Sequence, residues 1–418
     1  MLRKIATNTE LRIVVFSQLI DLISGILLIK ILSSFLTKSD FGYYSLTISL
    51  MALVSLLPFT IFDQGVARFI SIYKKDNVLK QNYSNILAIY VIILMIYFAL
   101  MANIKLFILH ESIWQKILLV LPFWLFFEVL KTTVLLIENS NRKRKFVAGS
   151  KFFELIFKNS LIILAYLYFG LDIQKLILIF ASISSVTVFF FFYQNMDVFQ
   201  LNKISFANMT KVFKDIWFFS YPLLIWSIFG WSQIMSNRWF LNTFMDESSV
   251  AEFSIVSSLA FVPPNAILGV IASFFIPIIY ERENIKKGYA INTTKKLLYI
   301  TVPIYAILII ITFLFSKEIL LVFTDGKYVT SAWMMPYMLI ATSFSALTAI
   351  TTYEIYARNM TSKLILPNIA GGIFSLIFGY YAISQYKMNG ALLNFILTYI
   401  VSGTLVMYKT FTYRESKS

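Results

Sequence analysis

The sequence lacks cysteine and has little charge. None of its 418 residues is a cysteine, and His110 is the only histidine. These absences exclude disulfide scaffolds, thiolate zinc sites, iron-sulfur clusters and cysteine nucleophiles, and one histidine cannot build a histidine metal site alone. We therefore expect no cofactor and no metal. Charged residues make up 14% of the chain, against about 25% in soluble domains.

Long hydrophobic runs take up most of the chain. Apolar residues make up 59% of the sequence, about 247 residues, and a membrane-spanning helix needs roughly 20. The chain thus has room for about twelve spans and none for a further soluble catalytic domain. The first run, residues 11–36, is too long for a signal-peptide core and is predicted as a retained helix. The spans are predicted to begin near Leu11, Phe41, Tyr83, Ile113, Phe152, Leu176, Ile216, Val250, Leu297, Trp333, Leu364 and Ala391.

Lysine and arginine alternate between the predicted loops. The tails and the even-numbered loops carry 25 of the 36, the opposite loops carry 6, and 5 lie in spans. Cytoplasmic loops are enriched in these residues, so the pattern predicts an even number of spans with both termini cytoplasmic. The net charge of +15 is then mainly a topology signal beside anionic lipid, and no nucleic acid is expected as a partner.

The two halves of the chain resemble each other. Residues Ser39–Leu46 resemble Ser248–Ile255 at an offset of 209, and the basic turn Asn139–Lys145 resembles Ala357–Lys363. Halves of six spans that start on the same side of the membrane would be parallel repeats.

The predicted fold is therefore an all-α integral membrane protein with pseudo-two-fold symmetry. Residues 1–194 form an N-terminal six-helix lobe and residues 216–418 a C-terminal one. The polar residues 195–215 form a cytoplasmic linker between them. Such lobes enclose a central cavity that can open to either side of the membrane.

Several stretches resemble the polysaccharide transporters of the multidrug/oligosaccharidyl-lipid/polysaccharide exporter superfamily. Residues Leu27–Leu46 resemble the first-helix signature of that family, and Asp63–Arg68 the end of its second helix. Phe219–Leu224 and Ser236–Leu241 are similar to its seventh helix, and the pair Gly390–Ala391 is typical of its last. The resemblance covers the whole chain through the order and spacing of these stretches.

The resemblance implies an O-antigen flippase. Such a protein moves an undecaprenyl-diphosphate-linked oligosaccharide, an O-antigen or capsule repeat unit, from the cytoplasmic to the outer leaflet of a bacterial inner membrane. It implies a monomeric, multi-pass transport unit in contact with membrane lipids. A polysaccharide polymerase and a chain-length regulator of the same lipopolysaccharide pathway are the implied partners.

Two cations in predicted spans are candidates for binding the diphosphate. Lys30 and Arg238 have no acidic neighbour three or four residues away. The offset of 209 maps Lys30 onto Trp239, beside Arg238. An Arg fork and a Lys point charge facing one cavity would suit a diphosphate. Snorkelling of both side chains to the outer surface is the alternative.

Two Glu/Lys pairs are further candidates. Glu128 and Lys131 are three residues apart, and Glu154 and Lys158 are four apart. Each pair shares a helix face. The pairs therefore either neutralise themselves as structural or gating ion pairs, or leave Lys131 and Lys158 to contact the substrate.

Other polar residues in the spans receive separate predictions. Asp21 and Glu354 are candidates for proton or cation coupling, because a charged carboxylate inside a membrane is costly and can exchange a proton. The alternative is a carboxylate that accepts hydrogen bonds from Ser, Asn or Gln neighbours. Asp63 and Arg68 are predicted to form a local salt bridge. Amide side chains that can bind sugar hydroxyls are Gln18, Gln233 and Asn237.

Two alternative functions remain at this stage. A cation-coupled multidrug exporter of the same superfamily would favour an apolar cavity with carboxylates over unpaired cations. A polysaccharide polymerase or ligase would need a large outer loop, whereas the longest predicted outer loop, 316–332, has about seventeen residues. The sequence has no Walker-type phosphate loop. We therefore expect a transporter and not an enzyme.

Overall fold

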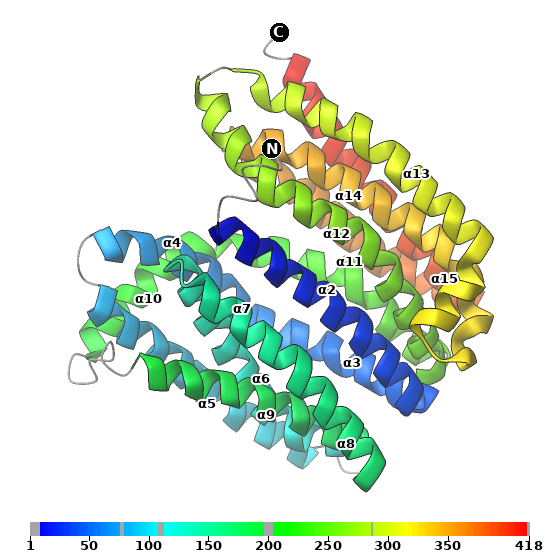
Figure 1. Cartoon of the computed structure of the whole chain (residues 1–418), viewed down its shortest axis with the longest axis horizontal. Coiled ribbons are helices and arrows are strands. Elements are labelled where there is room, and N and C mark those ends of the chain that lie inside the picture. The colour runs from blue at the N-terminus through cyan, green and yellow to red at the C-terminus, as the bar shows by residue number, and fades with distance from the viewer. Residues whose placement is uncertain are drawn as a thin grey trace. The chain divides into compact units, whose positions relative to one another are not determined.

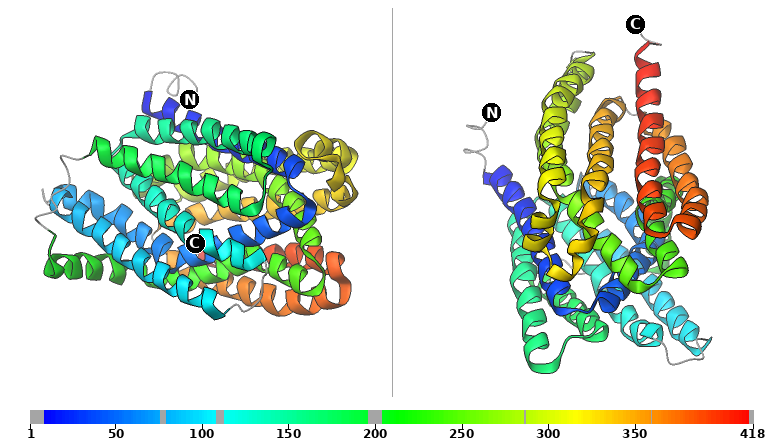
Figure 2. Two further views of the ribbon diagram at one scale, coloured as in Figure 1. Left: turned by 90° about the horizontal axis from the view of Figure 1, so that it is seen from below. Right: turned by 90° about the vertical axis from the view of Figure 1, so that its right-hand side faces the viewer.

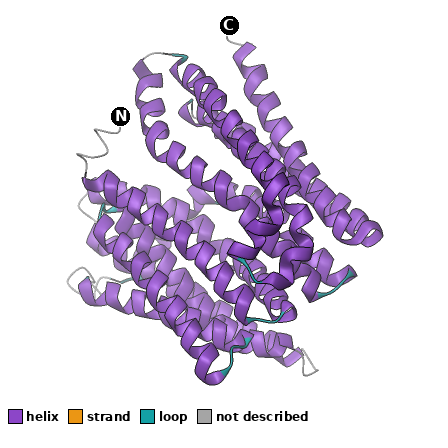
Figure 3. Ribbon diagram, turned by 45° about the vertical axis from the view of Figure 1, so that its right-hand side comes forward, coloured by secondary structure: helices purple, strands orange, loops and turns teal. Residues whose placement is uncertain are grey.

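The chain is helical throughout the part that the structure describes. The computed structural model describes residues 9–75, 79–107, 113–195, 204–285, 287–358 and 360–415. Over these residues it contains helices and short connections and no strand (Figure 3). This confirms the all-α prediction. His110 lies outside the described residues.

The helices follow one another with few connecting residues (Figure 1). In chain order they are α2 (Thr9–Phe35), α3 (Lys38–Ser55), η1 (Leu56–Thr60), α4 (Ile61–Lys75), α5 (Leu79–Phe107), α6 (Ile113–Ser140), α7 (Arg144–Phe153), η2 (Glu154–Lys158), α8 (Asn159–Phe169), α9 (Ile173–Gln194), α10 (Phe206–Ser220), α11 (Pro222–Phe244), α12 (Glu247–Ile285), α13 (Tyr289–Phe323), η5 (Gly326–Met334), α14 (Met335–Ala357), η6 (Thr361–Leu364) and α15 (Ile365–Glu415).

The described helices contain nine to eleven candidate membrane spans, against the twelve predicted. Nine stretches are long and apolar enough to cross a membrane, and two bent pairs, α3 with α4 and α10 with α11, raise the number to eleven. The bends measure 54° and 58°. Pro58 and Pro222 lie at these bends, where a residue without a backbone N–H interrupts helical hydrogen bonding.

The last two predicted spans both fall in α15, which has 51 residues and is broken at Lys387, where φ is 53°. An unbroken helix of that length would measure about 76 Å, more than twice a ~30 Å hydrocarbon core. Its two arms lie side by side, since Asn394 Nδ2 donates to the carbonyl of Ser375 at 3.1 Å (Figure 2). A Cβ on Gly390 would overlap the carbonyl of Ala382, so this close turn requires glycine.

Several predicted loops are helical instead. The predicted cytoplasmic loop between the eighth and ninth spans is mostly helix, because α12 continues to Ile285 and α13 begins at Tyr289. The predicted outer loop 316–332 is also mostly helix, since α13 continues to Phe323 and η5 begins at Gly326. Charged side chains interrupt the apolar pattern in these stretches, so the sequence predicted loops where the helices continue.

Contacts divide the chain into two compact units. The first unit comprises Met1–Ser24 and Leu50–Ser227, and the second comprises Gly25–Ser49 and Ile228–Ser418. These units differ from the predicted lobes: residues 25–49 pack with the second unit, and residues 216–227 with the first. Residues 206–215 of the predicted linker belong to α10, and residues 196–203 lie outside the described part.

Each unit is built around a central helix. In the first unit, α6 packs against α9, α5 and α4, and α10 packs on α4 and α5. In the second unit, α14 packs against α12, α13 and α15. Figure 1 shows α5, α6 and α9 together, and α12, α13 and α14 together.

The predicted repeat has a direct structural counterpart where α3 contacts α12. Ser45 donates to Ser254 at 2.5 Å, and these residues are 209 apart. Lys38 pairs with Glu252 at 2.5 Å, and the Tyr43 hydroxyl donates to Glu247 at 2.8 Å. The offset maps Lys38 onto Glu247 and Tyr43 onto Glu252.

The offset of 209 therefore maps the contact between Lys38 and Glu252 onto the contact between Glu247 and Tyr43. A two-fold interface has this property, in which residue i contacts j and the equivalent of j contacts the equivalent of i. The α3–α12 contact thus behaves like a two-fold interface within one chain, with Ser45 and Ser254 at its centre.

Candidate functional site: a charge cluster in the first unit

Four charged side chains from the middle of the first unit form one cluster. The charge cluster consists of Glu128, Lys131, Glu154 and Lys158. Lys131 Nζ lies 2.9 Å from Glu128 and 3.1 Å from Glu154, and Lys158 Nζ lies 3.0 Å from Glu154. The sequence predicted two separate pairs, whereas Lys131 joins them into one continuous network.

Three elements position the cluster. Glu128 and Lys131 lie on α6, and Glu154 and Lys158 begin and end the π-helical turn η2. Ser184 of α9 donates to Glu128 at 2.6 Å. A π-helical turn has i→i+5 hydrogen bonds and occurs often at functional sites. The turn η2 brings Glu154 to Lys131 of α6, and Lys158 Nζ lies 5.7 Å from the ring centroid of Phe180 in α9.

The charges of the cluster balance. Its two carboxylates and two ammonium groups sum to zero, and all four lie within candidate membrane spans. A charge at the centre of a bilayer costs at least ~2.5 kcal/mol on insertion scales, so mutual pairing lowers the cost of placing four charges there. Lys131 is 5% exposed. The Lys158 side chain is 13% exposed and has one carboxylate partner. Lys158 is therefore the cation that can change partners most easily.

Asp21 has a cationic partner that the sequence did not predict. Lys151 Nζ lies 2.5 Å from the Asp21 carboxylate. A fifth span that begins at Phe152 leaves Lys151 in the preceding loop, whereas α7 begins at Arg144 and includes Lys151. In this structure the Asp21 carboxylate therefore has a cationic partner on α7.

Two other predicted site residues, Gln18 and Glu354, lie in different units of the protein. Gln18 lines a pocket of about 410 Å³ in the first unit, together with Asn139 and Lys151. Glu354 of α14 is 3% exposed in the second unit. No group of three or more metal-ligating side chains occurs among the described residues.

The predicted salt bridge between Asp63 and Arg68 is wrong. Asp63 accepts hydrogen bonds from Tyr90 at 2.5 Å and from Thr133 at 3.0 Å. The Arg68 guanidinium lies over the ring of Phe219, 4.3 Å from its centroid. Five residues separate Asp63 and Arg68 on α4, so their side chains leave the helix in different directions.

Lys30 and Arg238 have different roles in the second unit. Lys30 Nζ donates to the carbonyls of Thr324 at 2.5 Å and Leu321 at 3.1 Å, at the end of α13. The last carbonyls of a helix lack partners within it, so this contact caps α13. Arg238 is buried, and its Nε donates to Ser254 at 3.0 Å. These contacts do not join the two cations to each other.

The amides predicted to bind sugars take part in helix packing. Gln233 Nε2 donates to the side chain and the backbone carbonyl of Asn368, at 2.6 and 2.9 Å. Asn394 Nδ2 donates to Asn237 Oδ1 at 2.6 Å. Buried amides need such partners, and in this conformation the two side chains already have them.

Comparison with known proteins gives a fold and no close relative. No protein-family model and no curated protein sequence matches the chain. The chain is similar to the lipid II flippase MurJ in an inward-closed conformation, with 14% identity, a TM-score of 0.69, and coverage of 94% of this chain and 85% of that one. It is similar to an inward-facing MATE family multidrug resistance transporter of the MOP superfamily, with 14% identity, a TM-score of 0.70, and 96% coverage of both chains.

A third similar structure is a MOP superfamily transporter from Pyrococcus furiosus. The identity is 13%, the TM-score is 0.64, and the match covers 97% of this chain and 95% of that one. The chain therefore has the fold of the MOP superfamily transporters.

Proposed function

We propose that the chain is a flippase for undecaprenyl-diphosphate-linked oligosaccharides. The observation that carries this proposal is the match with the fold of a lipid II flippase over 94% of the chain. That fold is compatible with moving a lipid-linked cargo across a bilayer. The sequence resemblance to polysaccharide transporters supports an O-antigen or capsule repeat unit as the cargo.

The charge cluster is the proposed contact for the charged part of the cargo. Lys158 and Lys131 are ammonium groups held within candidate spans, and an incoming diphosphate can compete with Glu154 for them. Lys30, Arg238, Gln18, Gln233 and Asn237 remain proposed contacts in other conformations. Asp21 and Glu354 remain the proposed coupling groups. A central cavity between lobes 1–194 and 216–418 completes the proposal.

The proposal places the protein in a bacterial inner membrane. Both termini are cytoplasmic, the transport unit is a monomer without cofactor, and a polymerase and a chain-length regulator act beside it. The alternative function, a multidrug exporter, is supported by the match to a MATE transporter over 96% of both chains.

Deletion of the gene in its native host tests the function. We expect loss of surface polysaccharide, with complete diphosphate-linked repeat units trapped in the cytoplasmic leaflet. Leaflet occupancy is measured by accessibility of the sugar to an impermeant lectin in spheroplasts and in inverted vesicles. Normal polymer in a strain without a redundant transporter would contradict the flippase and favour the exporter. Repeat units already in the outer leaflet would indicate a polymerase or ligase.

Complementation with variants tests the site. Lys158→Gln removes one cluster cation and is expected to restore less than a tenth of the polymer at equal protein level. Lys175→Gln is the matched control, because Lys175 is exposed at the start of α9 and pairs with Asp172. Equal amounts of surface polysaccharide from the two variants would show that Lys158 does not contact the substrate.

A further inference from the structure

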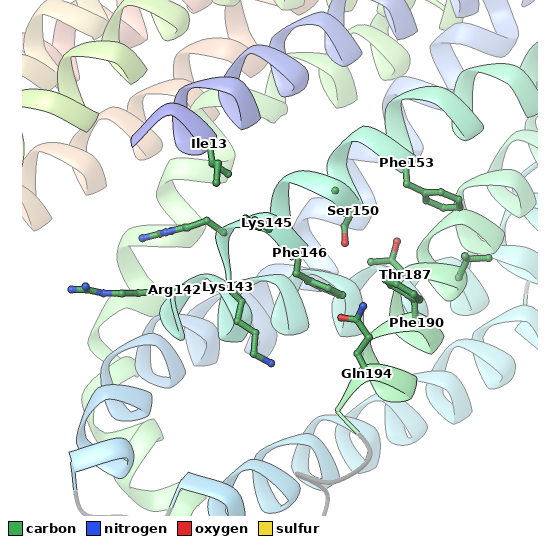
Figure 4. A pocket seen from close by; sticks show the side chains of 13 residues that line it. Ile13, Arg142, Lys143, Lys145, Phe146, Ser150, Phe153, Thr187, Phe190 and Gln194 are labelled. Atoms are coloured by element: carbon green, nitrogen blue, oxygen red, sulfur yellow. The ribbon is translucent and has the colours of Figure 1, made fainter. Parts of the chain in front are cut away.

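A large groove lies along α7 of the first unit and ends at Phe153, next in sequence to Glu154 of the charge cluster. Its volume is about 940 Å³, and α2, α7 and α9 contribute its walls. Figure 4 shows basic side chains at one end, from the turn before α7 and the first turn of the helix, and aromatic side chains toward the other. The groove therefore has a cationic end and an apolar end.

Four consecutive cations line the cationic end: Arg142, Lys143, Arg144 and Lys145. Lys143 pairs with Glu138, and Arg144 donates to Asn139. Arg142 and Lys145 are exposed and have no ion-pair partner among the described residues. An anion can thus be bound without breaking a protein ion pair.

The apolar end extends into a candidate membrane span. Phe146 and Phe190 stack with their centroids 6.0 Å apart, and Phe153 lies nine residues after Arg144. At 1.5 Å per residue the groove follows α7 for about 13 Å. The stretch Arg144–Phe169 is long and apolar enough to span the bilayer. The cationic end is therefore at the membrane surface, predicted to be cytoplasmic, and the apolar end is within the hydrocarbon.

We propose that this groove binds the lipid carrier of the substrate in the cytoplasmic leaflet. The diphosphate contacts Arg142 and Lys145, and the first part of the polyprenyl chain lies against Phe146, Phe153 and Phe190. A cluster of four cations complements a diphosphate better than the single charge of a common anionic phospholipid. The inference rests on the proposed function and adds to it a place where the substrate docks before translocation.

Binding to the purified full-length protein tests the groove. The probe is undecaprenyl diphosphate, titrated in detergent micelles and followed by microscale thermophoresis. The test variant is Arg142→Asn with Lys145→Gln. Asparagine suits position 142, where φ is 62°, because it tolerates positive φ better than most residues. We expect the variant to bind at least tenfold more weakly than the natural chain.

Two controls distinguish binding in this groove from a general effect of removing positive charge. Lys295→Gln with Lys296→Gln removes two exposed cations of α13 and is expected to change the affinity less than twofold. Phe153→Ala is expected to weaken binding of undecaprenyl diphosphate without changing binding of inorganic diphosphate. Equal affinity in the Arg142/Lys145 variant would overturn the proposal. Displacement by an equal concentration of phosphatidylglycerol would also overturn it, in favour of a site for bulk lipid.

The outcome is independent of the deletion experiment. Unchanged binding in the Arg142/Lys145 variant, with repeat units trapped in the deletion strain, would reject the groove and keep the flippase. Specific binding with normal polymer in the deletion strain would reject the flippase and keep a polyprenyl diphosphate site. Specific binding together with trapped repeat units would support both.

Discussion

At the scale of single residues, charged side chains in the spans contact an opposite charge or a backbone carbonyl. Lys131 contacts two carboxylates, Asp21 contacts Lys151, and Lys30 caps α13. A charge removed from water needs compensation from a neighbour. In the part of the chain that the structure describes, compensation comes from other helices more often than from the same helix. Sequence spacing identified the charged residues but only some of their partners.

Replacing Lys131 is expected to destabilise the protein strongly. Lys131→Met keeps the side-chain volume but leaves Glu128 and Glu154 without their shared cation. Breaking a buried ion pair on one side typically costs about 3–5 kcal/mol. The expected result is a lower thermal unfolding midpoint in detergent. Adding Glu128→Gln should restore part of the loss, because Glu128 has lost its cation whereas Glu154 keeps Lys158.

Lys175→Met is the control for this experiment. Its pair with Asp172 is 3.2 Å long, and the two side chains are 42% and 51% exposed. Lys175 Nζ also donates to the carbonyls of Phe169 at 2.8 Å and Gly170 at 2.9 Å, both exposed. Exposed pairs contribute about 0–1 kcal/mol, so a much smaller change in the midpoint than for Lys131→Met is expected. A Lys131→Met protein that unfolds at the wild-type temperature would show that the cluster contributes no net stability.

At the scale of helices, the contact of α3 with α12 is the most specific packing feature. Two exchanged polar contacts surround the Ser45–Ser254 hydrogen bond, and α3 approaches α12 closely at Gly42. A Cβ on Gly42 would overlap the backbone carbonyl of Glu247. Part of the family-like motif in residues 27–46 thus serves helix packing.

Gly42→Ala is expected to separate α3 from α12 and to lower the unfolding midpoint. The clash involves backbone, which cannot move away as a flexible side chain can. Gly25→Ala in α2 is the control, because nothing lies within 4 Å of its Cβ position. That change should stabilise the helix by up to about 1 kcal/mol. An equal effect of both substitutions would contradict the close approach.

A double-mutant cycle on Lys38 and Glu252 measures the strength of the same contact. We expect Lys38→Ala and Glu252→Ala to be coupled by about 0.5–3 kcal/mol, the range for residues in direct contact. Chemical unfolding of the two single variants and the double variant gives the coupling energy. Additive effects would mean that the ion pair does not form in solution.

At the scale of the whole molecule, the charge bias of the loops predicts the orientation in the membrane. The absence of cysteine makes this prediction testable with single introduced thiols. An impermeant maleimide should label Lys317→Cys in intact cells, because the residue is exposed and on the predicted outer side. Ser140→Cys, exposed beside the basic turn, should be labelled only after permeabilisation. The reverse pattern would invert the topology and move the α7 groove to the outer leaflet.

The local properties of the sequence determined the helical class, the number of spans and the position of the repeat. Apolar runs of bilayer length must form helices in lipid, because every backbone polar group needs a partner there. The ends of the helices were less predictable, since α7, α12 and α13 continue through charged residues that resemble loops. The motifs also resemble the multidrug/oligosaccharidyl-lipid/polysaccharide exporter (MOP) superfamily, and the chain has the fold of its transporters.

Only the tertiary structure decided which side chains meet. It joined Glu128, Lys131, Glu154 and Lys158 into one cluster, paired Asp21 with Lys151, and separated Asp63 from Arg68. Helical spacing identifies neighbours within one helix, three or four residues apart. Contacts across helices depend on packing angle and rotation about the helix axis, which many side chains set together. The residues of the candidate site could therefore be proposed from one sequence, but their partners could not.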